Sequence, residues 1–181
     1  MSKKNVILGV CGSIACYKAA ELTSRLTQGG RNVNVVMTKH ATEFVSPLTF
    51  QTLSRNPVTT GIFDEKESWH PGHIALADSA DLLLIAPATA NTIAKLACGI
   101  ADDALTSIAL ASLAPLLIAP AMNGKMWKHA ATQENVARLK ARGARFIGPE
   151  EGLLACGYEG IGRLWETAGI LEEAEKMLCG Q

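Results

Sequence analysis

A cysteine and a dense run of glycines stand close together near the end of the chain. Cys156 lies in the sequence Leu-Ala-Cys-Gly-Tyr-Glu-Gly-Ile-Gly-Arg, residues 154–163, and four glycines fall within residues 152–162. Glycine loses much backbone entropy on folding, so such a run is unfavourable in a packed helix or strand. Two interpretations are open. The segment is either a surface loop with an incidental thiol or a mobile flap, about residues 149–163, that brings a thiol to a substrate.

A turn near the N-terminus suits an anion. Gly12, Ser13 and Ile14 follow an apolar run and open a helical segment, where backbone N–H groups and the helix dipole favour a phosphate. The turn lacks the Gly-Lys-Ser/Thr ending of a P-loop and the G-x-G-x-x-G dinucleotide fingerprint. No acidic residue follows the second strand at Thr38 to bind an adenine ribose. The pattern therefore favours a mononucleotide with one phosphate over NAD, although a plain strand-to-helix turn has the same sequence character.

Small, hydroxylic and amide residues follow the other predicted strands. Ligands of parallel α/β sheets bind outside the carboxyl ends of the strands, so these residues form a candidate polar rim. Thr38, Thr89, Asn91 and Thr92 can serve the hydroxyls or the ring edge of a flavin, but each can also be explained as a helix N-cap. The remaining rim residues are Ala88, Ala90, Ala121, Met122 and Asn123.

One histidine stands in a context that suits proton transfer. His73 follows a Pro-Gly turn at the start of a short predicted helix, which makes it a candidate general base as well as an ordinary capping histidine. His70 lies three residues earlier, but no thiolate or carboxylate pair accompanies the two histidines. The sequence therefore predicts no metal site.

The elements that must position these residues alternate between apolar strands and helices. Because the strands are apolar on both faces, the pattern predicts an α/β fold: a single-domain, doubly wound parallel sheet with helices on both faces, spanning residues 1–181. Pro87 and Pro120 are expected to stop the third and fourth strands. The predicted strands are 5–10, 33–37, 81–86, 115–119 and 144–147, and the main helices are 14–28, 91–98, 103–112, 132–142 and 170–178.

Composition excludes several function classes. The 181 residues are 48% hydrophobic but only 5% aromatic, which suits close-packed α/β layers. Seventeen basic residues balance seventeen acidic ones, so no global field favours nucleic acid or an anionic membrane. The five scattered cysteines fit a reduced, cytoplasmic protein rather than a disulfide scaffold. No signal peptide or membrane span is predicted.

Five spaced motifs in this order resemble the flavin-dependent cysteine decarboxylases. The resemblance runs from about residue 6 to residue 163. Cys11 and Cys16 depart from it, because that family more often has small or hydroxyl residues there. The motifs are Gly-Ser-Ile-Ala-Cys-Tyr-Lys at 12–18, His-Ile-Ala-Leu at 73–76, Ala-Pro-Ala-Thr-Ala-Asn-Thr at 86–92, Pro-Ala-Met-Asn-Gly-Lys-Met-Trp at 120–127 and Ala-Cys-Gly at 155–157.

The resemblance implies a flavodoxin-like, Rossmann-like fold that binds FMN, in a homotrimer or a dodecamer with sites between neighbouring subunits. It implies decarboxylation of 4′-phosphopantothenoylcysteine to 4′-phosphopantetheine in coenzyme A biosynthesis, through a thioaldehyde and an ene-thiolate. Asn123 would hold the substrate carboxylate, His73 would act as base and Cys156 would protonate the ene-thiolate. The same motifs place Ala121 with Gly12, Ser13, Ile14, Thr38, Thr89, Ala90, Asn91 and Thr92 at the flavin, and Met126, Ala155 and Gly157 with Asn123 at the substrate.

Related activities remain as alternatives. Peptide-cysteine decarboxylases of lantibiotic maturation share His73 and Asn123 but lack the proton-donating Cys156. Flavin prenyltransferases lack the His-Ile-x-Leu and Ala-Cys-Gly motifs. Non-catalytic regulatory flavoproteins carry long acidic extensions that are not found here. A phosphopantothenate–cysteine ligase is a candidate partner, since many bacteria fuse it to the decarboxylase, and the sequence leaves open whether such a domain belongs to this chain.

Overall fold

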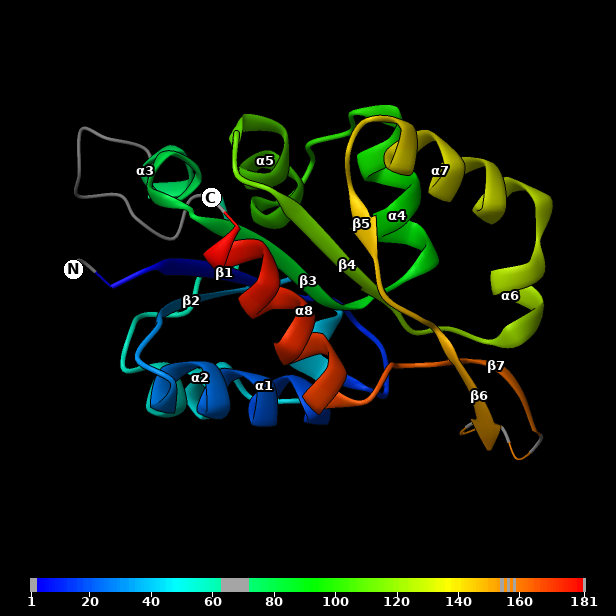
Figure 1. The fold of residues 1–181 in the computed structure, drawn as a ribbon, viewed down its shortest axis with the longest axis horizontal. Coiled ribbons are helices and arrows are strands. Elements are labelled where there is room, and N and C mark those ends of the chain that lie inside the picture. The colour runs from blue at the N-terminus through cyan, green and yellow to red at the C-terminus, as the bar shows by residue number, and fades with distance from the viewer. Residues whose placement is uncertain (1–2, 63–71, 154, 156, 158, 181) are drawn as a thin grey trace.

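The computed structural model describes residues 3–62, 72–153, 155, 157 and 159–180. Its centre is a five-stranded parallel sheet in the order β2-β1-β3-β4-β5. The predicted doubly wound α/β fold is confirmed, since each pair of neighbouring strands is parallel and helices cover both faces (Figure 1). The strands are β1 (Asn5–Val10), β2 (Asn32–Met37), β3 (Leu82–Ala88), β4 (Leu116–Pro120) and β5 (Arg145–Phe146).

Two helical layers bury the two faces of the sheet. One buried cluster packs β1, β2 and β3 against α1, α2 and α8, and the other packs the opposite face against α4, α5 and α7. Alanine, valine, leucine and isoleucine dominate both clusters, as the composition predicts. The helices are α1 (Cys16–Gln28), α2 (Pro47–Ser54), α3 (Gly72–Ser79), α4 (Ala90–Cys98), α5 (Ala104–Ala111), α6 (Gly124–Lys128), α7 (Ala130–Ala141) and α8 (Thr167–Cys179), with a short 3₁₀ turn at Ala41–Glu43.

The prediction that Pro87 stops the third strand is wrong. β3 continues through Pro87 to Ala88, and its pairing with β4 shifts register between Ile85 and Ala88. A register irregularity of this kind accommodates a proline, which has no N–H for the ladder, inside a central strand. After this shift β3 ends at Ala88, just before the start of α4.

The glycine-rich segment contains a hairpin that the sequence did not predict. β6 (Glu150–Leu153) and β7 (Glu159–Arg163) pair antiparallel as a separate two-stranded sheet. The hairpin projects on the side of the molecule where the strands of the main sheet end, far from α3 (Figure 1). The fold therefore places the predicted flap beside the carboxyl ends of the strands.

Candidate functional site

A cavity of about 770 Å³ lies at the carboxyl ends of the strands. Its volume falls within the range of roughly 300–1,000 Å³ usual for ligand pockets. Five segments meet there: the β1–α1 turn with the first turn of α1, the end of the 3₁₀ turn after β2, the β3–α4 loop with the start of α4, the β4–α6 loop with α6, and the hairpin with the residue that follows it. The predicted site residues on its lining are Gly12, Ser13, Ile14, Thr89, Ala90, Ala121, Asn123, Met126 and Ala155.

The β1–α1 turn has the features of an anion cradle. The Ser13 amide donates to the Cys11 carbonyl at 2.8 Å, whereas the amides of Gly12 and Ile14 have no hydrogen-bond partner among the described residues. Helix α1 then begins without a side-chain cap. A Cβ at residue 12 would stand 2.4 Å from the Cβ of His40, so only glycine fits the turn. Unpaired amides at a helix N-terminus suit a phosphate.

Two buried cysteine thiols, Cys11 and Cys16, lie next to this cradle in the sequence and are hydrogen-bonded around it. The Sγ of Cys16 donates to the Cys11 carbonyl at 2.9 Å. Burial raises the pKa of the Cys11 thiol to about 12, against a smaller opposing effect of its hydrogen bond with the Thr92 side chain. Burial raises the pKa of the Cys16 thiol as well, so both thiols stay protonated near neutral pH and act as hydrogen-bonding groups rather than nucleophiles. Cys11 links the β1–α1 turn to the β3–α4 segment.

Of the residues predicted to bind the cofactor at the end of β3, some line the cavity and others belong to helix α4 and lie off the lining. Thr89 lines the cavity and caps α4, since its Oγ1 accepts from the Thr92 amide at 3.3 Å. Thr92 is buried beneath it, and Asn91 is exposed away from the lining. Thr38 does not line the cavity either, and its amide donates to the Val10 carbonyl at 3.0 Å.

The β4–α6 loop presents Asn123 to the cavity. Asn123 caps α6, and its Oδ1 accepts from the Lys125 amide at 2.9 Å. The hairpin packs closely against this loop, because the Met122 amide donates to the Gly162 carbonyl at 2.9 Å. A Cβ at Gly162 would stand 2.1 Å from the Met122 carbonyl oxygen, and one at Gly124 would stand 2.5 Å from that of Ile161. These glycines therefore allow two backbones to touch beside Asn123.

The tip of the flap is described only in part. Cys156 lies outside the described residues, so its predicted role remains a proposal. Ala155 lines the cavity, and so does Leu153 at the end of β6. Gly157 has a positive φ of 87° and is not on the lining.

His73 lies away from the cavity of its own chain. It stands at the start of α3, which packs against α5 on the side of the molecule opposite the hairpin (Figure 1). Its Nδ1 is buried and has no hydrogen-bond partner among the described residues. The fold of one chain therefore does not bring His73 and Asn123 together.

Sequence reasoning missed two cationic side chains on the cavity lining, Lys18 and Arg163. The signal was available, because Lys18 lies in the first helical turn after the anion cradle and Arg163 ends the glycine-rich segment. Tyr17, Phe44 and Leu164 also line the cavity and were not singled out.

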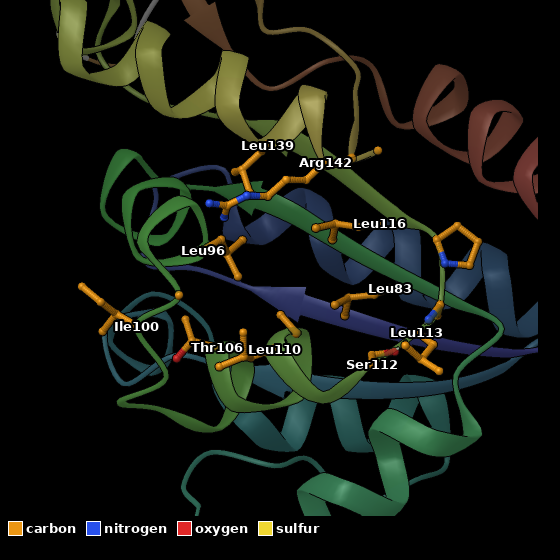
Figure 2. Close-up of a pocket in the computed structure, with 16 residues that line it drawn as sticks. Leu83, Leu96, Ile100, Thr106, Leu110, Ser112, Leu113, Leu116, Leu139 and Arg142 are labelled. Atoms are coloured by element: carbon orange, nitrogen blue, oxygen red, sulfur yellow. Dashed lines mark hydrogen bonds between the residues drawn. The ribbon is translucent and has the colours of Figure 1, made fainter.

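A second hollow of about 470 Å³ lies near the amino ends of β3 and β4 (Figure 2). Its lining is mostly aliphatic, with side chains from β3, β4, α4, α5 and α7, and it includes none of the predicted site residues. Arg142 lies beside it and donates from its guanidinium to the Ala97 carbonyl at 2.9 Å. The two hydroxyls on its described lining are already used in the fold: Thr106 donates to Asp103 Oδ1 at 2.8 Å, and Ser112 donates to the Ala77 carbonyl at 3.1 Å.

The described part of the chain lacks two features. No helix there combines the length and the apolar character needed to cross a membrane. No three or more His, Cys, Asp or Glu side chains gather there in a group that could hold a metal ion.

Comparisons with known proteins agree with this geometry. The family model described as Flavoprotein matches residues 1–178. The chain is 54% identical over 176 residues to the coenzyme A biosynthesis bifunctional protein CoaBC of Bacillus subtilis, a match that covers 97% of this chain but 43% of that protein. It is 48% identical over 177 residues to the probable phosphopantothenoylcysteine decarboxylase of Streptococcus mutans, covering 97% of this chain and 99% of that one.

Solved structures give the same result. A mutant PPC decarboxylase complexed with pantothenoylaminoethenethiol is 34% identical with a TM-score of 0.87, and the match covers 96% of this chain and 97% of that one. The FMN-dependent cysteine decarboxylase SpaF is also 34% identical, with a TM-score of 0.80, and the match covers 94% and 97% of the two chains. Because the family model covers nearly the whole sequence and relatives match it along the same length, the chain belongs to the flavoprotein family.

Proposed function

We propose that the protein is a cytoplasmic, FMN-dependent decarboxylase that converts 4′-phosphopantothenoylcysteine to 4′-phosphopantetheine in coenzyme A biosynthesis. The observation that carries this proposal is the lining of the larger cavity, where the Gly12–Ile14 anion cradle, Asn123 and the base of the hairpin meet. The similarity to the Streptococcus mutans decarboxylase and to the PPC decarboxylase complex supports the same activity.

The residues present fit FMN. The free amides of Gly12 and Ile14 would hold its phosphate, and Thr89, Ala90 and Ala121 would line the rest of the cofactor. Asn91, Thr92 and Thr38 lie off the cavity lining, so they would contribute by shaping the first turn of α4 and the segment after β2. When bound, the flavin would supply a reversible hydride acceptor, which makes loss of CO2 from the neighbouring carbon possible.

The substrate end of the cavity is assigned to Asn123, Met126 and the flap. The Asn123 side-chain amide would donate to the substrate carboxylate, with Met126, Ala155 and Gly157 shaping the surface around it. His73 would remove a proton from the substrate cysteine, and Cys156 would give a proton to the ene-thiolate after decarboxylation. The protein thus orients the substrate and moves its protons.

A neighbouring copy of the chain would complete the site. His73 does not reach the cavity within one chain, so a symmetric assembly must bring the α3 of one subunit to the cavity of the next. Large apolar side chains exposed at and near the cavity mouth support such an interface. They are Ile14, Tyr17, Phe44 and Met126, each at least half exposed. We propose a homotrimer, with assembly of trimers into a dodecamer, and a phosphopantothenate–cysteine ligase as the partner that makes the substrate.

A cofactor and substrate analysis tests this function. Purified protein should release FMN at close to one equivalent per chain, because none of the described lining residues is an aspartate or a glutamate that could bind the ribose of an adenosine. It should decarboxylate 4′-phosphopantothenoylcysteine and leave peptides with a C-terminal cysteine unchanged, as followed by mass spectrometry. Recovery of FAD or a nicotinamide nucleotide, or turnover of the peptide alone, would contradict the proposal.

A further inference from the structure

The larger cavity is cationic on one side. Lys18 and Arg163 line it, and none of its described lining residues is an aspartate or a glutamate. The side chain of Lys18 is only 16% exposed, so its charge is held at the cavity rather than in bulk water. Arg163 is the last residue of β7 and lies at the base of the flap. A site with this balance attracts an anion.

Two carboxylates hold these cations in place. Lys18 Nζ lies 3.7 Å from Glu166 Oε1, and the Arg163 guanidinium contacts the same oxygen. Arg163 Nη2 also lies 3.4 Å from Glu150 Oε2. The hydrogen bond from Arg163, with the charge of Lys18, lowers the pKa of Glu166, so the carboxylate is ionised at neutral pH. Neither glutamate lines the cavity, whereas both cations do.

The placement of Glu166 is fixed by its neighbours. It occupies the N-cap position of α8, and the hydroxyl of the next residue, Thr167, donates to Glu21 Oε1 on α1 at 2.9 Å. Its own amide donates to Glu150 at 3.2 Å. Since one carboxylate oxygen contacts both cations, Lys18 and Arg163 lie close enough to each other to share the oxygens of a single tetrahedral anion.

We propose that Lys18 and Arg163 form the subsite that binds the 4′-phosphate of the substrate. Arginine offers a planar fork of donors that matches phosphate oxygens, and lysine adds a compact point charge beside it. The subsite is separate from the Gly12–Ile14 cradle, because the Lys18 ammonium lies 3.7 Å from Glu166. That residue occupies the N-cap position of α8, beyond the hairpin in the sequence. Selection for a phosphorylated substrate over a cysteine peptide then follows from these two residues. This inference rests on the proposed function for the identity of the ligand.

A ligand pair that differs only in the phosphate tests the subsite. Calorimetry on the flavin-loaded protein should show tighter binding of 4′-phosphopantetheine than of pantetheine. Arg163→Met and Lys18→Met should each weaken binding of the phosphorylated ligand by about tenfold or more, the usual effect of losing a charge-assisted hydrogen bond. Binding of pantetheine should change by less than about twofold, because it lacks the group that these residues bind.

Matched variants separate this role from general effects of charge. Arg145→Met removes an exposed cation paired with Glu173 at 3.2 Å, outside the cavity, and should leave both affinities unchanged. Lys18→Arg keeps the charge and should retain most of the preference for phosphate, which guards against a folding defect in Lys18→Met. Equal weakening of both ligands would overturn the subsite, and so would loss of FMN with the phosphate preference intact.

The same preparations separate failure of the subsite from failure of the proposed function. If wild-type protein decarboxylates 4′-phosphopantothenoylcysteine but Arg163→Met keeps the full preference for phosphate, the subsite is wrong and the function stands. If the wild-type protein neither turns over this substrate nor prefers 4′-phosphopantetheine to pantetheine, both are wrong.

Discussion

Replacing His73 by Asn, or Asn123 by Asp, is expected to reduce CO2 release by at least about a hundredfold, as is usual for loss of a general base or of an oriented binding group. His73→Asn removes the only proposed base. Asn123→Asp places a carboxylate where the carboxylate of the substrate must bind, and two like charges at contact distance near a protein surface repel by about 4 kcal/mol. Both variants should keep their flavin spectrum, because neither residue belongs to the anion cradle.

Mixing these two inactive variants gives the sharper result. If His73 acts in the cavity of a neighbouring subunit, co-expressed His73→Asn and Asn123→Asp chains should form some sites with both native residues. Random assembly into a cyclic trimer restores about a quarter of the sites, and so about a quarter of the wild-type activity. Each variant expressed alone is the control. Mixed assemblies without activity, in a verified hetero-oligomer, would contradict a shared site.

The second large effect is expected for Cys156→Ser. A serine hydroxyl has a far higher pKa than a thiol and is a poor proton donor, so reduction of the ene-thiolate should stall after CO2 has left. The product should be lighter than 4′-phosphopantetheine by one pair of hydrogen atoms, as measured by mass spectrometry. Cys98→Ser, at an exposed thiol on α4 outside the cavity lining, is the matched control and should leave the product unchanged. Fully reduced 4′-phosphopantetheine from Cys156→Ser at the wild-type rate would mean that Cys156 is not the acid.

The sheet could be predicted because a strand that is buried on both faces is an almost continuous apolar run in the sequence. The segments that form β1 and β3 are almost uninterrupted apolar runs, and their residues are almost completely buried. The strands of the hairpin have no such pattern. β6 and β7 contain glycine and charged residues and do not alternate between apolar and polar side chains. Its position depends on the contact of Gly162 with the Met122 carbonyl, a tertiary approach that spacing along the chain does not reveal.

The sequence predicted the parts of the site that follow directly from strand ends. It predicted less well the parts that depend on where individual side chains lie. Gly12 and Asn123 follow strands directly, so the parallel topology brings them to one cavity. A residue after a strand can also cap the next helix, as Thr89 does when its Oγ1 accepts from the Thr92 amide. His73 could not be placed from one chain, because in the proposed assembly its partner residues would belong to another copy. Lys18 and Arg163 are brought close together by their shared contact with Glu166, and no motif in the sequence predicts that contact.

Anaerobic turnover of wild-type protein is the most direct test of the central claim. The proposed decarboxylation is redox-neutral overall, so multiple turnovers should proceed without oxygen or any added electron acceptor. Each 4′-phosphopantothenoylcysteine consumed should yield equal amounts of CO2 and fully reduced 4′-phosphopantetheine, quantified by gas analysis and mass spectrometry. Turnover that stops after one equivalent per flavin, with an oxidised ene-thiol as the product, would contradict it.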